Sequence, residues 1–148
     1  MTHRRSVPSK SGPVGAIVFA FAALTGAACS GGSAAGTING VGNNAVPASN
    51  IRNAVLGLCT GARQAADPAA AKAAFFDLSH AGLHDLAYAQ EQHDRAGAAK
   101  LLVAMQTVEA DLNAPPGSRP RADDLAALAR QAALSQAAVG LASTTCPS

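Results

Sequence analysis

The stretch DRAGAAKLLVAMQTVEADLN, residues 94–113, has the clearest structural pattern in the chain. Its apolar residues recur every three or four positions, which places them on one face of a helix. They are Ala98, Leu101, Leu102, Met105, Val108 and Leu112. Asp94 precedes the first turn, where its carboxylate is suited to accept hydrogen bonds from unpaired backbone N–H groups. We therefore predict a helix that begins after Asp94 and runs to Leu112.

The segment before it, residues 68–93, predicts a second helix. Asp67 suits the N-cap position, and Pro68 suits the first helical position, where its missing N–H costs nothing. Gly82 lies in the middle and marks either a close crossing with another helix or a slight bend. The turn near residue 93 is so short that this helix and the next must be antiparallel neighbours. One side of the helix is expected to face the core, namely Phe75, Phe76, Leu83, Leu86, Ala87 and Gln90.

Two further helices complete the pattern. The first should span residues 50–65, and its apolar face consists of Ile51, Val55, Leu58, Ala62 and Ala65. The other should follow the proline-rich linker at residues 113–120, with Asp123 and Asp124 in its first turn, where carboxylates complement the helix dipole. Its core-facing residues are expected to be Leu125, Leu128, Ala132 and Val139.

This last helix also has a second apolar stripe, on the side opposite to its first. The stripe contains Leu134, Ala138 and Leu141. Our main interpretation is a helix packed on two sides. The alternative is a patch that faces a partner, because an exposed apolar strip normally marks an interaction site.

Composition supports an all-α fold. Alanine accounts for 37 of the 148 residues, whereas aromatic residues make up only 3% and tryptophan is absent. We predict an up-down-up-down four-helix bundle over residues 50–148. The net charge of +2, with both signs interspersed, argues against binding to nucleic acid, which needs a concentrated basic face.

The N-terminal residues, 1–28, have the three-part order of a secretory signal peptide. Four basic or imidazole side chains come first, followed by the apolar run Val14 to Leu24 and then by small residues. The apolar run is about half as long as the roughly 20 residues that a membrane-spanning helix needs. We therefore expect export without a transmembrane anchor.

The sequence LTGAACSGG, residues 24–32, resembles the signal of bacterial lipoproteins. That resemblance implies cleavage before Cys29, lipidation of Cys29, and a protein anchored to the extracytoplasmic side of the cell membrane. The alternative is ordinary cleavage after Ala35 and secretion. Residues 29–49 are rich in Gly, Ser and Asn without periodicity, so we expect a flexible tether between the membrane and the bundle.

Two cysteines remain in the domain, Cys59 and Cys146. An even pair in an oxidising compartment predicts one disulfide. The two residues are far apart in sequence, whereas redox-active pairs usually sit close together, so we expect the bond to be structural. The bundle topology supports this pairing, because it places the end of the last helix beside the early part of the first.

One group of side chains suggests chemistry. His80 and His84 are four residues apart and lie on one helical face, with Asp77 a turn earlier and Glu91 two turns later. Imidazole with carboxylate suits Zn²⁺ or Cu²⁺ rather than Ca²⁺. Our main interpretation is a solvated polar face in which His80 borders the core, and the metal site is the alternative.

No known nucleophile or phosphate-loop motif is present, so we expect a non-enzymatic protein without a cofactor. Residues 75–87 resemble uncharacterised small secreted helical proteins of high-GC bacteria, which implies no activity. Our leading hypothesis is a lipid-anchored domain that binds an envelope protein or small ligand at the cell surface. The alternative is a metal-binding (Zn or Cu) envelope protein.

Overall fold

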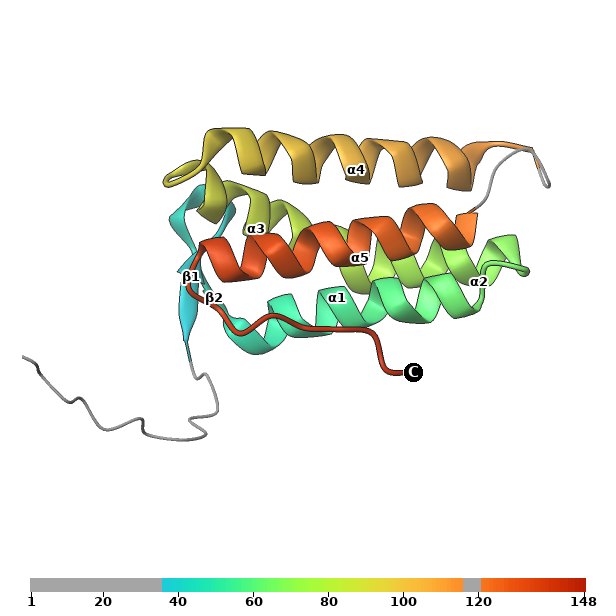
Figure 1. Cartoon of the computed structure of the whole chain (residues 1–148), viewed down its shortest axis with the longest axis horizontal. Helices are drawn as coiled ribbons and strands as arrows, with labels where there is room; N and C mark the ends of the chain where they lie inside the picture. Colours follow the sequence, from blue (N-terminus) through green and yellow to red (C-terminus); the bar gives the residue numbers. More distant parts are fainter. Residues whose placement is uncertain (1–35, 116–120) are drawn as a thin grey trace, which may run out of the picture. The chain divides into compact units, whose positions relative to one another are not determined.

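The computed structural model describes residues 36–115 and 121–148, and this part of the chain is mostly helical (Figure 1). Its helices are α1 (Ala48–Arg63), α2 (Pro68–Ala73), α3 (His80–Glu91), α4 (Arg95–Asn113) and α5 (Arg121–Ala138). A π-helical segment, η2 (Ala74–Ser79), joins α2 to α3, and a short 3₁₀ turn, η1 (Val41–Asn43), joins the strands β1 (Thr37–Asn39) and β2 (Ala45–Pro47). None of the helices in the described ranges combines the length and apolarity of a membrane span.

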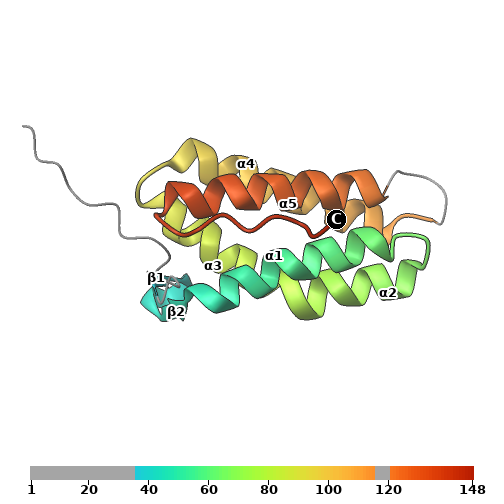
Figure 2. The ribbon, with the colours of Figure 1, turned by 60° about the horizontal axis from the view of Figure 1, so that its bottom comes forward.

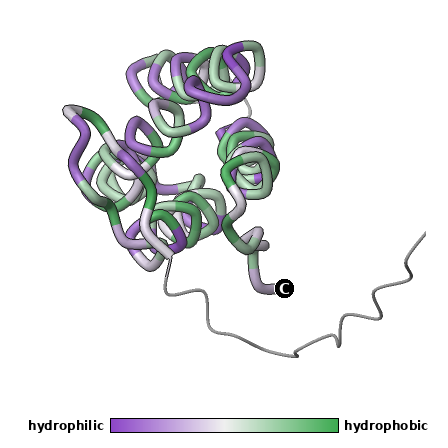
Figure 3. Tube along the Cα trace, turned by 90° about the vertical axis from the view of Figure 1, so that its left-hand side faces the viewer, coloured by the Kyte–Doolittle hydropathy of each residue, from purple (hydrophilic) through white to green (hydrophobic). Residues whose placement is uncertain are grey.

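The helices form four rods, because α2, η2 and α3 follow one another without a break. Successive rods run in opposite directions, and α1 packs against α5, α3 against α4, and α4 against α5 (Figures 1 and 2). Viewed from one end, the four rods surround a common interior (Figure 3). The predicted up-down-up-down four-helix bundle is therefore confirmed.

The predicted helix caps are present. Asp67 Oδ1 accepts hydrogen bonds from the N–H groups of Ala69 and Ala70 at 2.9 and 3.1 Å, and Asp94 Oδ1 accepts one from Gly97 at 2.9 Å. These bonds satisfy backbone donors that the first helical turn leaves unpaired. The boundaries of the first helix differ by two residues at each end from the predicted residues 50–65. Its C-terminus is earlier because the chain turns after Arg63, where the N–H of Asp67 donates to the carbonyl of Gln64.

The predicted apolar faces form the core with two main exceptions. Phe76 and Leu102 are each 36% exposed, although both were expected to face inward. Leu102 follows Leu101, which is fully buried, and adjacent residues on a helix point about 100° apart. Phe76 likewise follows the fully buried Phe75, and both lie in η2, where the regular α-helical wheel does not apply.

Glycines in two helices permit α1 to approach the second rod closely. A Cβ on Gly57 of α1 would lie 2.9 Å from Leu78 Cβ and would also collide with Ser79 Oγ. A Cβ on Gly82 of α3 would lie 2.7 Å from Ala54 Cβ. The close crossing that Gly82 predicted is therefore confirmed.

The structure contradicts the expected flexible tether at residues 29–49 over residues 37–49. β1 and β2 pair as an antiparallel hairpin with Ile38 opposite Val46, and both of these side chains are 8% exposed. Asp85 of α3 fastens the turn, because its Oδ1 accepts a hydrogen bond from the N–H of Val41 at 2.9 Å. Two three-residue strands gain their order from packing against helices, which the local composition does not reveal. The signal peptide, Cys29 and the tether up to residue 35 lie outside the described residues.

The predicted disulfide joins Cys59 and Cys146, whose Cα atoms are 5.3 Å apart. The route to it differs from the expected one, in which the end of the last helix lay beside the early part of the first. Helix α5 ends at Ala138, the chain reverses at Gly140 with φ of +76°, and residues 141–146 then run back along α1 (Figure 2). We call residues 141–146 the C-terminal strap. The strap reaches Cys59 in the last third of α1.

Candidate metal centre

The two predicted histidines lie together on α3. His80 is the first residue of this helix and His84 follows one turn later, so their rings are in edge-to-face contact, with centroids 4.6 Å apart and planes at 75°. His80 is half-buried, whereas His84 is exposed. The i, i+4 spacing thus brings the two rings together as the sequence predicted.

A third polar group comes from the neighbouring helix. Glu109 of α4 approaches His80, and the distance from His80 Nε2 to Glu109 Oε1 is 3.0 Å. Both side chains are about one-third exposed, at 31% and 33%. One ligand atom from each of His80, His84 and Glu109 can be chosen so that all three lie within 4.8 Å of one another.

The sequence did not predict Glu109 as part of this group, but a signal for it exists. Helices α3 and α4 form an antiparallel hairpin folded at Asp94. Residues at similar distances from such a turn lie opposite each other, and His80 precedes Asp94 by 14 residues while Glu109 follows it by 15. Pairing the two helices in this way brings Glu109 to the level of His80, and the register in which the helices pack decides that the two side chains meet.

The two carboxylates that the sequence did predict do not join the histidines. Glu91 lies about 10 Å further along the axis of α3 from His84, and its Oε1 is 3.5 Å from the Nε of Arg95. Asp77 is exposed and lies in η2, where the wider π-helical turn changes the angular spacing of side chains. Among the residues described, the candidate ligands that cluster are therefore His80, His84 and Glu109.

The π-helical segment and its aromatic residues position His80. The ring centroid of His80 is 5.5 Å from that of the buried Phe75 and 5.5 Å from that of the partly exposed Phe76. Ser79, directly before His80, is buried and donates a hydrogen bond from Oγ to the carbonyl of Ala74 at 3.2 Å. Packing on one side and a carboxylate on the other restrict the rotation of this imidazole. Single π-helical turns inside α-helices occur frequently at functional sites.

The geometry of the three groups fits a transition-metal ion. Two ligands at about 2.1 Å from a tetrahedral Zn²⁺ lie roughly 3.4 Å apart. His80 Nε2 and Glu109 Oε1 are already closer than this. The largest distance between two ligand atoms of the group would have to shorten by about 1 to 1.5 Å. The exposed side chain of His84 has room to supply that movement. Three protein ligands would leave one position of a tetrahedral ion for water or another ligand.

The second apolar stripe of α5 divides in the structure. Leu134 is 66% exposed, whereas Leu141 lies in the strap and packs against the core. The stripe is therefore packed at one end and open to solvent at the other, so neither of the two sequence interpretations describes all of it.

No family model, no curated protein and no solved structure matches this chain. Its function is accordingly inferred from the chemistry of its own residues.

Proposed function

We propose that this protein is an exported, non-enzymatic domain that binds a divalent transition-metal ion, Zn²⁺ or Cu²⁺, at the cell envelope. The observation that carries this proposal is the convergence of His80, His84 and Glu109 from two helices, with their ligand atoms within 4.8 Å. The proposal keeps the expectation of a ligand-binding protein at the cell surface and identifies the ligand as a metal ion.

The donor set supports the choice of metal. Imidazole nitrogen is a common ligand of Zn²⁺ and Cu²⁺, whereas Ca²⁺ and Mg²⁺ are bound mainly by oxygen ligands. Within the described residues, Met105 is buried in the core and both cysteines form the disulfide. The soft sulfur ligands that Cu⁺ prefers are thus absent from the proposed site.

The proposed location rests on the N-terminal sequence. A signal-peptide pattern precedes Cys29, and a disulfide is typical of proteins that leave the cytoplasm. We propose that Cys29 is lipidated and holds the bundle on the extracytoplasmic side of the membrane. The lipid and the metal ion are the two partners this proposal assigns, and nucleic acid is not among them.

Removing one ligand should weaken metal binding strongly. We expect His84→Ala and Glu109→Gln each to raise the dissociation constant for Zn²⁺ or Cu²⁺ at least about tenfold, because each removes one of three direct ligands. In the wild-type protein, metal at a hundred times its dissociation constant should add about 2.7 kcal/mol to the free energy of unfolding. Isothermal titration calorimetry and thermal unfolding with and without metal measure the two effects. Affinity should also fall at acid pH, since protons compete with the metal for imidazole nitrogen.

Glu91→Gln is the matched control, because Glu91 is on the same helix as the histidines but pairs with Arg95. We expect it to bind metal like the wild type. Equal losses in Glu91→Gln and Glu109→Gln would contradict the assigned ligand set. If neither metal changes the melting temperature of the wild-type protein, the proposal fails. His80 is then a packing residue that is bonded to Glu109.

The anchor has a separate test. Mass spectrometry of the protein extracted from membranes should show a chain that begins at Cys29 and carries added lipid mass. A Cys29→Ser variant should lose this mass and leave the membrane fraction. A soluble mature form that begins at Gly36 would contradict the anchor and indicate plain secretion. The hairpin and bundle would be unchanged in that form, because their described contacts begin at Gly36, whose carbonyl accepts a hydrogen bond from Ala48.

A further inference from the structure

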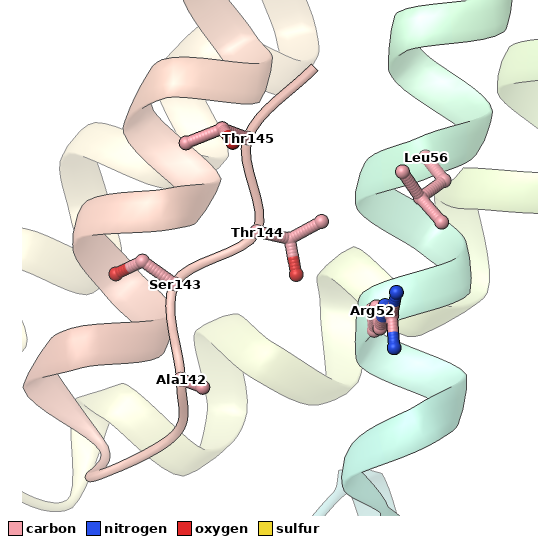
Figure 4. A pocket seen from close by; sticks show the side chains of 6 residues that line it. All are labelled: Arg52, Leu56, Ala142, Ser143, Thr144 and Thr145. Carbon is pink, nitrogen blue, oxygen red and sulfur yellow. The ribbon is translucent and has the colours of Figure 1, made fainter. Parts of the chain in front are cut away.

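A second candidate site lies between α1 and the C-terminal strap, apart from the histidine cluster (Figure 4). It is a half-open pocket of about 300 Å³, near the lower limit of small-ligand sites. Arg52 and Leu56 of α1 form one wall, and residues 142–145 of the strap form the other. None of His80, His84 and Glu109 lines it.

The lining offers positive charge and hydrogen-bond donors. Arg52 is the charged residue of the pocket, and no acidic side chain lines it. Arg52 is exposed and has no hydrogen bond or ion pair to any residue that the structure describes. Its guanidinium presents five N–H donors in a planar arrangement that matches a carboxylate. A ligand that meets this wall should therefore be an anion with hydrogen-bond acceptors.

The strap adds one oriented hydroxyl. Thr144 Oγ1 accepts a hydrogen bond from Gln136 Nε2 at 3.1 Å, which leaves the hydroxyl hydrogen available to donate. Gln136 also accepts a hydrogen bond from the backbone N–H of Thr144 at 2.8 Å, so this one side chain holds the residue at two points. Figure 4 shows the side chain of Thr144 on the side of the strap that faces α1, whereas Ser143 points toward α5. Ser143 is engaged there, because its Oγ donates to the carbonyl of Ala133 at 2.9 Å.

Two of the other lining residues are apolar. Leu56 is half-buried and lies one turn from Arg52 on the same side of α1, and Ala142 lines the pocket from the start of the strap. The single cation matches one negative charge on a ligand. The short apolar surface beside it matches a short alkyl chain on the same ligand. A phosphate carries more charge than this site neutralises and has no apolar part for Leu56 to contact.

We infer that this pocket binds the carboxylate of a small aliphatic acid. The carboxylate accepts two hydrogen bonds from the guanidinium of Arg52 and one from the hydroxyl of Thr144, and the alkyl chain lies against Leu56. With one partly solvated arginine, we expect a dissociation constant on the order of 1 mM. This inference does not depend on metal binding at the histidine cluster.

The test is a titration of the ¹⁵N-labelled mature protein, followed by amide chemical shifts at constant ionic strength and with EDTA present. The probes are sodium hexanoate, sodium acetate and inorganic phosphate. Hexanoate should cause saturable shifts at the strap and around Arg52, and acetate should bind several-fold more weakly because it lacks the chain. Arg52→Gln should weaken hexanoate binding at least about fivefold.

Arg63→Gln is the matched control, since Arg63 lies on the same helix, three turns away, and is also exposed. It should bind hexanoate like the wild type. Far-ultraviolet circular dichroism should show both variants folded. Any of four results would overturn the inference. The first two are shifts that do not saturate and shifts that are centred away from the strap. The other two are an Arg52→Gln variant that binds hexanoate as tightly as the wild type does, and phosphate that binds as tightly as hexanoate.

Discussion

Replacing both Cys59 and Cys146 by serine should lower the free energy of unfolding by about 4 to 5 kcal/mol in the chain-entropy account of disulfides. The bond joins residues 87 positions apart, so its loss releases a loop that covers most of the domain. A typical domain is stable by only about 5 to 15 kcal/mol, and this change is a large part of that margin. Chemical denaturation of the wild type and the double variant, followed by circular dichroism, measures the difference.

Reduction of the wild-type protein provides the matched comparison for this prediction. Reduced wild type and double serine variant should unfold at nearly the same denaturant concentration, since both lack only the bond. Peptide mapping without reductant should recover the linked pair from the oxidised protein. A loss below about 1 kcal/mol would contradict the prediction and would mean that hydrogen bonds such as those between Gln136 and Thr144 hold the strap without help.

Phe75→Ala should lower the free energy of unfolding by about 3 to 5 kcal/mol. The ring of Phe75 is fully buried in the core, so its removal leaves a cavity as well as losing apolar burial. The loss should also loosen the site, because the ring packs 5.5 Å from that of His80. Thermal and urea unfolding measure the stability change.

Phe76→Ala is the control, because Phe76 is the same residue type one position later and is 36% exposed. It should cost markedly less than Phe75→Ala. Adjacent residues of a helical segment point in clearly different directions, and here only the ring of Phe75 is enclosed by the core. Equal losses for the two variants would therefore contradict the burial of Phe75 and the partial exposure of Phe76.

Much of the candidate site could be predicted from local sequence. The i, i+4 spacing places His80 beside His84 in any helix, and the structure shows their rings in edge-to-face contact. Glu109 is 29 residues from His80, and no local pattern links them. Their contact depends on the register of two packed helices, which is set by how side chains of α3 and α4 interlock.

Three errors have the same physical origin. A regular wheel places Asp77 beside the histidines, but residues 74–79 form a π-helical segment that packs closely against Gly57 of α1. The composition of residues 37–47 predicts a tether, whereas the order of this hairpin comes from burying Ile38 and Val46 in the domain. The strap was unforeseen because it is extended and its hydrogen bonds reach back to α5.

The sequence by itself determined the four helical rods, their caps, their order and the partner of each cysteine in the domain. These features depend on periodicity, on side chains within three residues of a helix end, and on cysteine number. Only the tertiary structure decided which carboxylate meets His80, which phenylalanine is buried, and where the strap lies against α1. Such contacts join residues that are distant in sequence. Their geometry depends on how the helices pack, and a shift of one residue in helical register would change it.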